Sequence, residues 1–150
     1  MTLEQLRDQL SSIEASAATY AGIGPSEVAL LEELVDDPEP WLAARAIFAL
    51  SKVGSDAAVA ILVRATADPR PEVRVAVAAS AKNLRPADAD GILLQALSDP
   101  ELGVRKFAVR SVARAHSAEV QAALRELEDK DSAQSIRDAA KLKLSEIHES

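Results

Sequence analysis

The stretch DPEPWLAARAIFALSKV at residues 37–53 decides the fold, because its pattern returns three more times along the chain. The other copies read DPRPEVRVAVAASAKNL at 68–84, DPELGVRKFAVRSVARA at 99–115 and DSAQSIRDAAKLKLSEI at 131–147. The first three copies begin 31 residues apart. Self-similarity at a fixed period of this length is the sequence signature of a repeat protein.

Two columns of aliphatic residues keep the same register. One column lies five residues after each Asp: Leu42, Val73, Val104 and Ile136. The other lies upstream of each turn at a spacing of 31: Leu31, Leu62, Leu93 and Leu124. Apolar residues on both sides of the turn recur at helical spacing, so each repeat is predicted to be a helical hairpin. In that hairpin the Asp side chain is expected to cap a turn or a helix start, and Pro is expected to fix φ where the second helix begins.

The composition is that of one globular domain. The chain has 150 residues, of which 48% are hydrophobic and 27% are charged. It contains no cysteine, which excludes disulfides, thiolate catalysis and Cys-ligated zinc. It also lacks an apolar run of roughly 18 residues, the length that a membrane span needs, and the order of a signal peptide. We therefore expect a single cytoplasmic domain over 1–150.

The repeat resembles the HEAT repeat, in particular the short variety found in phycobilin lyase subunits. The resemblance rests on the Asp-Pro-x-x-x-Val-Arg pattern and covers about residues 26–148. It implies an all-α, right-handed α-solenoid in which first helices are convex and second helices line the concave side. The four hairpins are expected at about 25–54, 55–85, 86–116 and 117–150. Their second helices are expected near 40–54, 72–85, 103–116 and 135–148.

The first 24 residues precede the repeats. Leu3, Leu6, Leu10, Ile13, Ala17 and Tyr20 fall on one face of a helix predicted over 2–21. Repeat arrays need a distinct element over their exposed ends, so this helix is predicted to cap the stack.

Asp and Arg side chains recur at the turns and resemble the ladder that ties neighbouring HEAT units together. The predicted ladder residues are Asp68, Arg74, Asp99, Arg105, Asp131 and Arg137. The alternative is that these arginines bind a phosphate or carboxylate ligand. Both the Asp and the Arg recur at every turn, which favours the ladder. The first repeat departs from the pattern, because Ala43 replaces the arginine and Arg45 stands two positions on, which leaves Arg45 for another role.

Charge is sorted between the two sets of helices. The segments 41–54, 72–85, 103–116 and 135–150 carry twelve basic and four acidic residues, a net +8, so the rest of this −7 chain carries −15. On the concave side this sorting predicts a basic groove inside an acidic shell, which favours an acidic ligand. The structural alternative places several of these bases in the ladder or at helix C-terminal dipoles.

Aromatic and basic residues also share a helix face. Trp41, Arg45, Phe48 and Lys52 are spaced by 4, 3 and 4 residues, away from the core line of Leu42. An aromatic ring beside an arginine is typical of an interaction hot spot. Ordinary packing between helices is the alternative for Phe48 and Phe107, and for Phe107 it is the favoured interpretation. The predicted partner-binding residues are Trp41, Arg45, Phe48, Lys52, Lys82, Lys106, Arg110 and Arg114.

Together these features predict a non-enzymatic scaffold or adaptor that binds an acidic, partly apolar protein segment. The sequence has no Gly-rich phosphate loop, and His116 and His148 lack a second ligand at metal spacing, so we expect no catalytic residue, metal or cofactor. The resemblance leaves two alternatives. One is nucleic-acid binding of the kind seen in HEAT-like DNA glycosylases, against which the overall acidity argues. The other is an accessory subunit of a bilin-lyase-like enzyme with a chromophore on the concave face.

Overall fold

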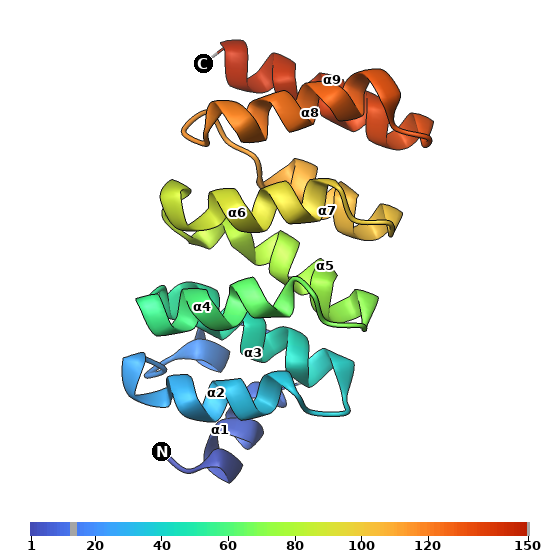
Figure 1. Cartoon of the computed structure of the whole chain (residues 1–150). Helices are drawn as coiled ribbons and strands as arrows, with labels where there is room; N and C mark the ends of the chain where they lie inside the picture. Colours follow the sequence, from blue (N-terminus) through green and yellow to red (C-terminus); the bar gives the residue numbers. More distant parts are fainter. Residues whose placement is uncertain (13–14, 150) are drawn as a thin grey trace. The chain divides into compact units, whose positions relative to one another are not determined.

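The computed structural model describes residues 1–12 and 15–149. Within this part of the chain there are nine α-helices, short 3-10 segments and no strand (Figure 1). The prediction of an all-α fold is therefore confirmed. None of the helices described is long and apolar enough to cross a membrane.

The helices fall into two compact units, residues 1–77 and 78–150. Unit 1 contains α1 (Leu3–Leu10), α2 (Val28–Val35), α3 (Pro40–Val53) and α4 (Asp56–Ala65). Unit 2 contains α6 (Pro86–Leu97), α7 (Leu102–Ser111), α8 (Ala118–Lys130) and α9 (Gln134–Glu149). The unit boundary falls inside α5 (Pro71–Ser80).

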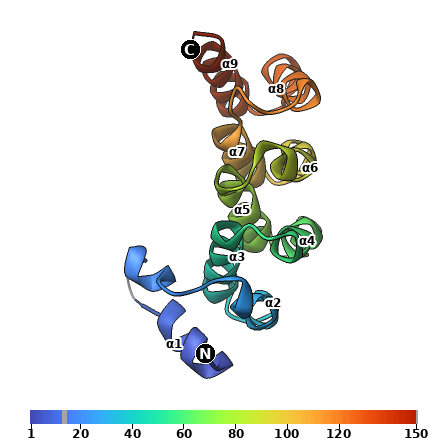
Figure 2. The ribbon, with the colours of Figure 1, turned by 90° about the vertical axis from the view of Figure 1, so that its left-hand side faces the viewer.

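Each unit is built from two layers of helices. In unit 1, α2 and α4 lie side by side and α3 packs against both, while α1 packs against α2 and α3 (Figure 2). In unit 2, α6 and α8 form one layer, and α7 and α9 form the other. The pairs α2 and α3, α6 and α7, and α8 and α9 are in direct contact, as helical hairpins require.

The two aliphatic columns of the repeat form the core. The leucines of the first helices, Leu31, Leu62, Leu93 and Leu124, are buried, and so are their counterparts in the second helices, Leu42, Val73, Val104 and Ile136. Small residues beside them, such as Ala46, Ala108 and Ala140, are fully buried. An alanine at these positions lets neighbouring helices approach closely, which is how a core with few aromatics closes.

Most helix ends have a local cause in the sequence. Ser55 and Ser117 accept hydrogen bonds from the backbone N–H groups of Ala58 and Val120, so they cap the starts of α4 and α8. α3 ends at Gly54, whose φ of +63° is the left-handed conformation that terminates a helix and favours glycine.

The proline of the Asp-Pro pair does not begin the second helix, contrary to the sequence interpretation. It lies in the turn, and α3 and α5 begin two residues later at Pro40 and Pro71. The Asp side chain makes the turn instead: the N–H of the second residue after it donates to Oδ1 of Asp37, Asp68, Asp99 and Asp131. An Asp that bonds the backbone two residues on forms an Asx turn.

Three predicted helices are shorter in the structure. α1 stops at Leu10 instead of continuing to 21; Ala17–Tyr20 form a 3-10 segment, and Ile13 lies outside the described residues. α5 gives way to a 3-10 segment at Ala81–Asn83. α7 ends at Ser111 rather than at His116. The backbone N–H of Ala113 donates to Nδ1 of the buried His116 at 2.7 Å, which closes a turn there.

Candidate functional site

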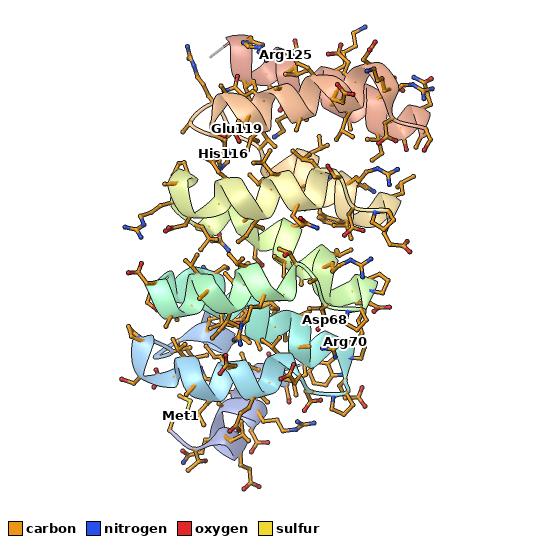
Figure 3. All side chains as sticks on the ribbon, viewed as in Figure 1. Met1, Asp68, Arg70, His116, Glu119 and Arg125 are labelled. Carbon is orange, nitrogen blue, oxygen red and sulfur yellow. The ribbon has the colours of Figure 1, made fainter. Side chains whose placement is uncertain are left out.

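The turn before α5 is held by an arginine outside the predicted ladder column. Arg70 Nε lies 3.0 Å from Asp68 Oδ1, and the two side chains are adjacent in Figure 3. The same guanidinium donates to the main-chain oxygens of Asp37 at 2.6 Å and Val35 at 2.7 Å. Arg70 therefore ties the turn after α4 to the end of α2. Sequence reasoning missed it because only the second copy has an arginine at this position.

Electrostatics at these turns follow from the same contacts. Burial alone would raise the pKa of Asp68, but the hydrogen bonds and charge of Arg70 hold that pKa below its usual value. The hydrogen bond to Asp68 in turn raises the pKa of Arg70. At the preceding turn, the Arg7 side chain and the N–H of Glu39 lower the pKa of Asp37. Both carboxylates are thus stabilised in their charged forms.

The arginines of the predicted ladder bind mainly backbone oxygens. Arg74 Nη1 donates to the main-chain oxygen of Asp68 at 2.9 Å, and Arg105 Nη1 donates to that of Asp99 at 3.0 Å. Arg137 donates in the same way to the main-chain oxygen of Asp131. In the second, third and fourth copies the arginine therefore fastens the turn that opens its own helix.

Arg105 makes an additional link between repeats. Its Nε lies 2.8 Å from Asp131 Oδ2, and its Nη2 lies 3.2 Å from Oδ1. This two-point contact joins α7 to the turn before α9 and is nearly enclosed. A planar arginine fork on a carboxylate fixes geometry as well as supplying energy.

The α3 stripe, defined as Trp41, Arg45, Phe48 and Lys52, lies on the face of α3 away from its core residues. Trp41 is 46% exposed. The Arg45 guanidinium carbon lies 5.5 Å from the centroid of the Trp41 ring, and Lys52 Nζ lies 5.2 Å from that of Phe48. The stripe thus contains two cation–π pairs, each made by residues four apart on the helix.

The chain that follows α1 folds back onto this stripe. Arg45 Nη1 donates to the main-chain oxygen of Leu10 at 2.6 Å and also to that of Ser12. The Tyr20 ring lies 4.9 Å from the Phe48 ring at an angle of 54°. Arg45 and Phe48, which the sequence assigns to partner binding, are therefore both engaged by the chain's own N-terminal residues.

The N-terminal arm, defined as residues 15–21, is also tied to α1. Gln9 Nε2 donates to the main-chain oxygens of Thr19 at 3.1 Å and Ala21 at 2.7 Å. Burial raises the pKa of Tyr20, an effect that the charge of Arg45 partly offsets. The carbonyl oxygen of Leu10, the last residue of α1, accepts from Arg45 instead of from a further turn of helix, which accounts for the early end of α1.

A pocket of about 530 Å³ remains between the N-terminal arm and α3. Its apolar lining comes from Ala15, Ala17, Tyr20, Ala44 and Phe48. Ser16 also lines it, together with two basic residues of the α3 stripe, Arg45 and Lys52. None of the described residues of this lining is acidic, although the chain carries a net charge of −7.

In unit 2, the α7 face combines the same residue types. The Arg110 guanidinium carbon lies 5.1 Å from the centroid of the Phe107 ring. Lys106 and Arg110 are exposed, and Phe107 between them is partly exposed. The exposed Arg114 follows in the loop after α7, and the exposed Lys82 lies on the 3-10 segment that contacts α7. We call Lys82, Lys106, Phe107, Arg110 and Arg114 the α7 face.

Other bases of the second helices are used inside the fold. Lys143 Nζ donates to the main-chain oxygen of Arg110 at 3.1 Å, and Arg85 Nε lies 2.8 Å from Asp88 Oδ2. Within the described part of the chain, the side chains of Lys106, Arg110 and Arg114 have no hydrogen bond or ion pair.

Acidic residues gather on the first helices of unit 1. A second pocket, of about 470 Å³, lies between α2 and α4 and is lined by Glu32, Glu33, Asp36 and Asp68, with Arg64 among them. Arg64 is paired with Glu32. These carboxylates lie on the α2 and α4 side of unit 1, the layer that does not contain the α3 stripe.

Within residues 1–12 and 15–149, no group of three or more His, Cys, Asp or Glu side chains is arranged to hold a metal ion. His116 is buried. Its ring accepts a backbone hydrogen bond, and its main-chain oxygen accepts another from Gln121. His148 is exposed in the last turn of α9.

Several solved structures share this fold, among them a phycocyanin lyase complex and a designed repeat protein. The complex of CpcE and CpcF of phycocyanin lyase from Nostoc sp. PCC7120 matches with a TM-score of 0.73 and 21% identity, over 95% of this chain and 97% of that one. A designed armadillo repeat protein in complex with the peptide (KR)4 matches with a TM-score of 0.58 and 19% identity, over 95% of this chain and 80% of that one. At such identities the likeness concerns the fold alone.

No curated protein matches the sequence. The family model described as HEAT repeats matches residues 26–90 and 64–145, which together are more than half of the chain. The buried leucine columns and the contacting helix pairs agree with that match. The protein therefore belongs to the HEAT-repeat family.

Proposed function

We propose that this protein is a non-enzymatic interaction module that binds an acidic, partly apolar segment of a partner protein. Helical repeat folds of this kind commonly serve as protein-binding scaffolds. The proposal assigns the binding to basic and aromatic residues of the second helices, with one set of residues in unit 1 and another in unit 2.

The observation that carries the proposal is the pairing of Arg110 with Phe107 on the α7 face. The guanidinium lies 5.1 Å from the ring centroid and is exposed, so a partner can meet an apolar ring and five N–H donors at one place. Arginine and aromatic residues are enriched among the residues that dominate binding energy. Lys106 and Arg114 add positive charge nearby, which attracts an acidic segment.

In unit 1, the proposal assigns partner contacts to Trp41 and Lys52. Trp41 is 46% exposed although tryptophan is a large apolar residue, and its ring is held by Arg45. Arg45 and Phe48 support this surface through the N-terminal arm. Trp41 is therefore the expected apolar anchor, and its truncation should mainly increase the dissociation rate.

The test is a binding screen against displayed peptides that vary in acidic and apolar content, followed by kinetics with the best binder. We expect acidic peptides with aromatic or aliphatic residues to be selected. The double variant Arg110→Glu and Arg114→Glu should slow association at least ten-fold at low salt and weaken its salt dependence. The control reverses two exposed charges of α8, with Arg125→Glu and Lys130→Glu.

Three results would contradict the proposal. They are selection of basic peptides, equal effects of the α7 and α8 variants, and retention of full affinity in both the α7 variant and Trp41→Ala. A steep salt-dependent affinity for DNA that requires Arg110 and Arg114 would support the nucleic-acid alternative instead.

A second candidate function rests on the fold shared with the phycocyanin lyase complex. In this case the chain would be an accessory subunit of a bilin-lyase-like enzyme. Purification from its native host should then yield a coloured complex, with an absorbance band at visible wavelengths that follows the protein through gel filtration. A colourless preparation that still captures acidic peptides would favour the interaction module.

A further inference from the structure

We propose that the pocket between the N-terminal arm and α3 binds a small amphipathic carboxylate, with its apolar part in the pocket and its carboxylate at Lys52. This site lies in unit 1, apart from the α7 face, and it shares Lys52 with the partner contacts proposed for that unit. It goes beyond the proposed function because its ligand is a small molecule and not a protein segment.

The pocket walls are apolar on both sides. Tyr20, Ala15 and Ala17 come from the N-terminal arm, and Phe48 and Ala44 come from α3. A volume of about 530 Å³ lies within the range of small-molecule sites, roughly 300–1,000 Å³. An apolar group that fills this space would remove both rings and the three alanine methyl groups from water, which favours binding.

The charge of the lining selects an anion. Among the residues that the structure describes, Arg45 and Lys52 are the titratable groups of the lining besides Tyr20, and none of the lining residues is a carboxylate. Lys52 Nζ lies over the Phe48 ring at 5.2 Å, and within the described residues Lys52 has no carboxylate partner. An anionic head group at Lys52 would therefore gain a charge-assisted hydrogen bond without displacing an existing ion pair.

The hydrogen bonds around the pocket point to a ligand held between two elements. Arg45 fixes the end of α1 and Gln9 fixes Thr19 and Ala21, so the arm is anchored at its edges while the pocket remains beneath it. A ligand that contacts both Tyr20 and Phe48 would bridge the arm and α3. Binding should therefore slow amide hydrogen exchange in the arm and also stabilise unit 1.

The experiment titrates the full ¹⁵N-labelled chain with octanoate and, as the neutral match, octanamide. We expect octanoate to shift the amide signals of residues 15–20 and 44–52 with saturation, and octanamide to bind at least three-fold more weakly. Lys52→Gln should lower octanoate affinity roughly three- to ten-fold. Lys106→Gln removes an exposed lysine from α7 and should leave the affinity unchanged.

A second variant tests the apolar part of the pocket. Ala44→Leu adds three carbons to the lining while keeping a good helix former, so it should reduce octanoate binding without unfolding α3. The proposal would be overturned if octanoate binding did not saturate or if octanamide bound with equal affinity. It would also be overturned if Lys52→Gln bound octanoate as tightly as the wild type, or if the shifted amide signals came from residues outside the pocket. None of these results bears on peptide capture by the α7 face, so the two proposals fail separately.

Discussion

Arg105 and Asp131 form an ion pair whose side chains are only 12% and 4% exposed. Removing one partner of such a pair leaves a buried charge without compensation, which is costly. We therefore expect Arg105→Ala to lower the free energy of unfolding by about 2 kcal/mol, measured by urea denaturation at pH 7.

Arg110→Ala is the matched control for this prediction. Arg110 lies on the same helix but is exposed, so its loss should cost about 0.5 kcal/mol or less. Equal urea midpoints for the two variants would show that the contact between Arg105 and Asp131 contributes nothing particular to stability.

Asp68 should make the stability of the protein depend on pH. Its pKa is lowered in the folded state by Arg70, so the ionised carboxylate stabilises the fold fully above its unfolded pKa of about 4. That stabilisation is lost as the pH falls through the lower folded value. Asp68→Asn should therefore cost about 1–2 kcal/mol at pH 7 and progressively less in acid.

Urea denaturation of the wild type and of Asp68→Asn between pH 7 and pH 2.5 measures this difference. Asp129→Asn, at an exposed position of α8, is the matched control and should change the free energy of unfolding little. A constant difference between wild type and Asp68→Asn over the whole range would contradict the assignment of the carboxylate as charged.

At the scale of elements, the N-terminal arm is the segment whose attachment is easiest to follow. Tyr20 is the only tyrosine of the chain, so its ionisation is readable by ultraviolet absorbance. Burial raises its pKa, which means that folding favours the neutral phenol. Its contribution to stability is present below the unfolded pKa of about 10 and is lost as the pH rises through the folded value.

Phe48→Ala should release Tyr20 and return its pKa toward about 10, because the ring that covers it is gone. Amide hydrogen exchange of residues 15–21 should accelerate in the same variant. Phe107→Ala removes the corresponding kind of side chain from unit 2 and serves as the control. An unchanged Tyr20 titration in Phe48→Ala would show that Phe48 does not hold the arm.

The repeat elements can be predicted from the sequence because their signals recur. A leucine returns every 31 residues and so identifies the buried face four times. The sequence alone therefore assigns four leucines to the core: Leu31, Leu62, Leu93 and Leu124. The Asx turns follow in the same way from a repeated Asp.

The arm and the Arg70 contact occur once, and no repetition indicates them. The helical spacing of apolar residues continues past Leu10, so a longer first helix is the natural prediction from local pattern. The helix ends at Leu10, whose carbonyl oxygen accepts a hydrogen bond from the distant Arg45, and Gln9 of α1 donates to the carbonyl oxygen of Ala21 in the arm. Such tertiary hydrogen bonds have no local signature. The same contact engages Arg45, which the sequence assigns to partner binding, with the end of α1.

At the scale of the whole molecule, the division into residues 1–77 and 78–150 predicts how stability is distributed. Leu31 and Leu93 occupy the same column of the repeat and are both fully buried, one in each unit. Replacing either leucine with alanine should lower the free energy of unfolding by roughly 2–5 kcal/mol, since each substitution leaves a cavity.

In a repeat protein each repeat contacts mainly its neighbours, so a local defect need not unfold the entire array. We therefore expect native-state hydrogen exchange in Leu31→Ala to accelerate mainly in α2 to α4, and in Leu93→Ala mainly in α6 to α9. Acceleration spread evenly over both units in both variants would instead mean that the chain unfolds as one cooperative body, because the same free energy would then control every amide.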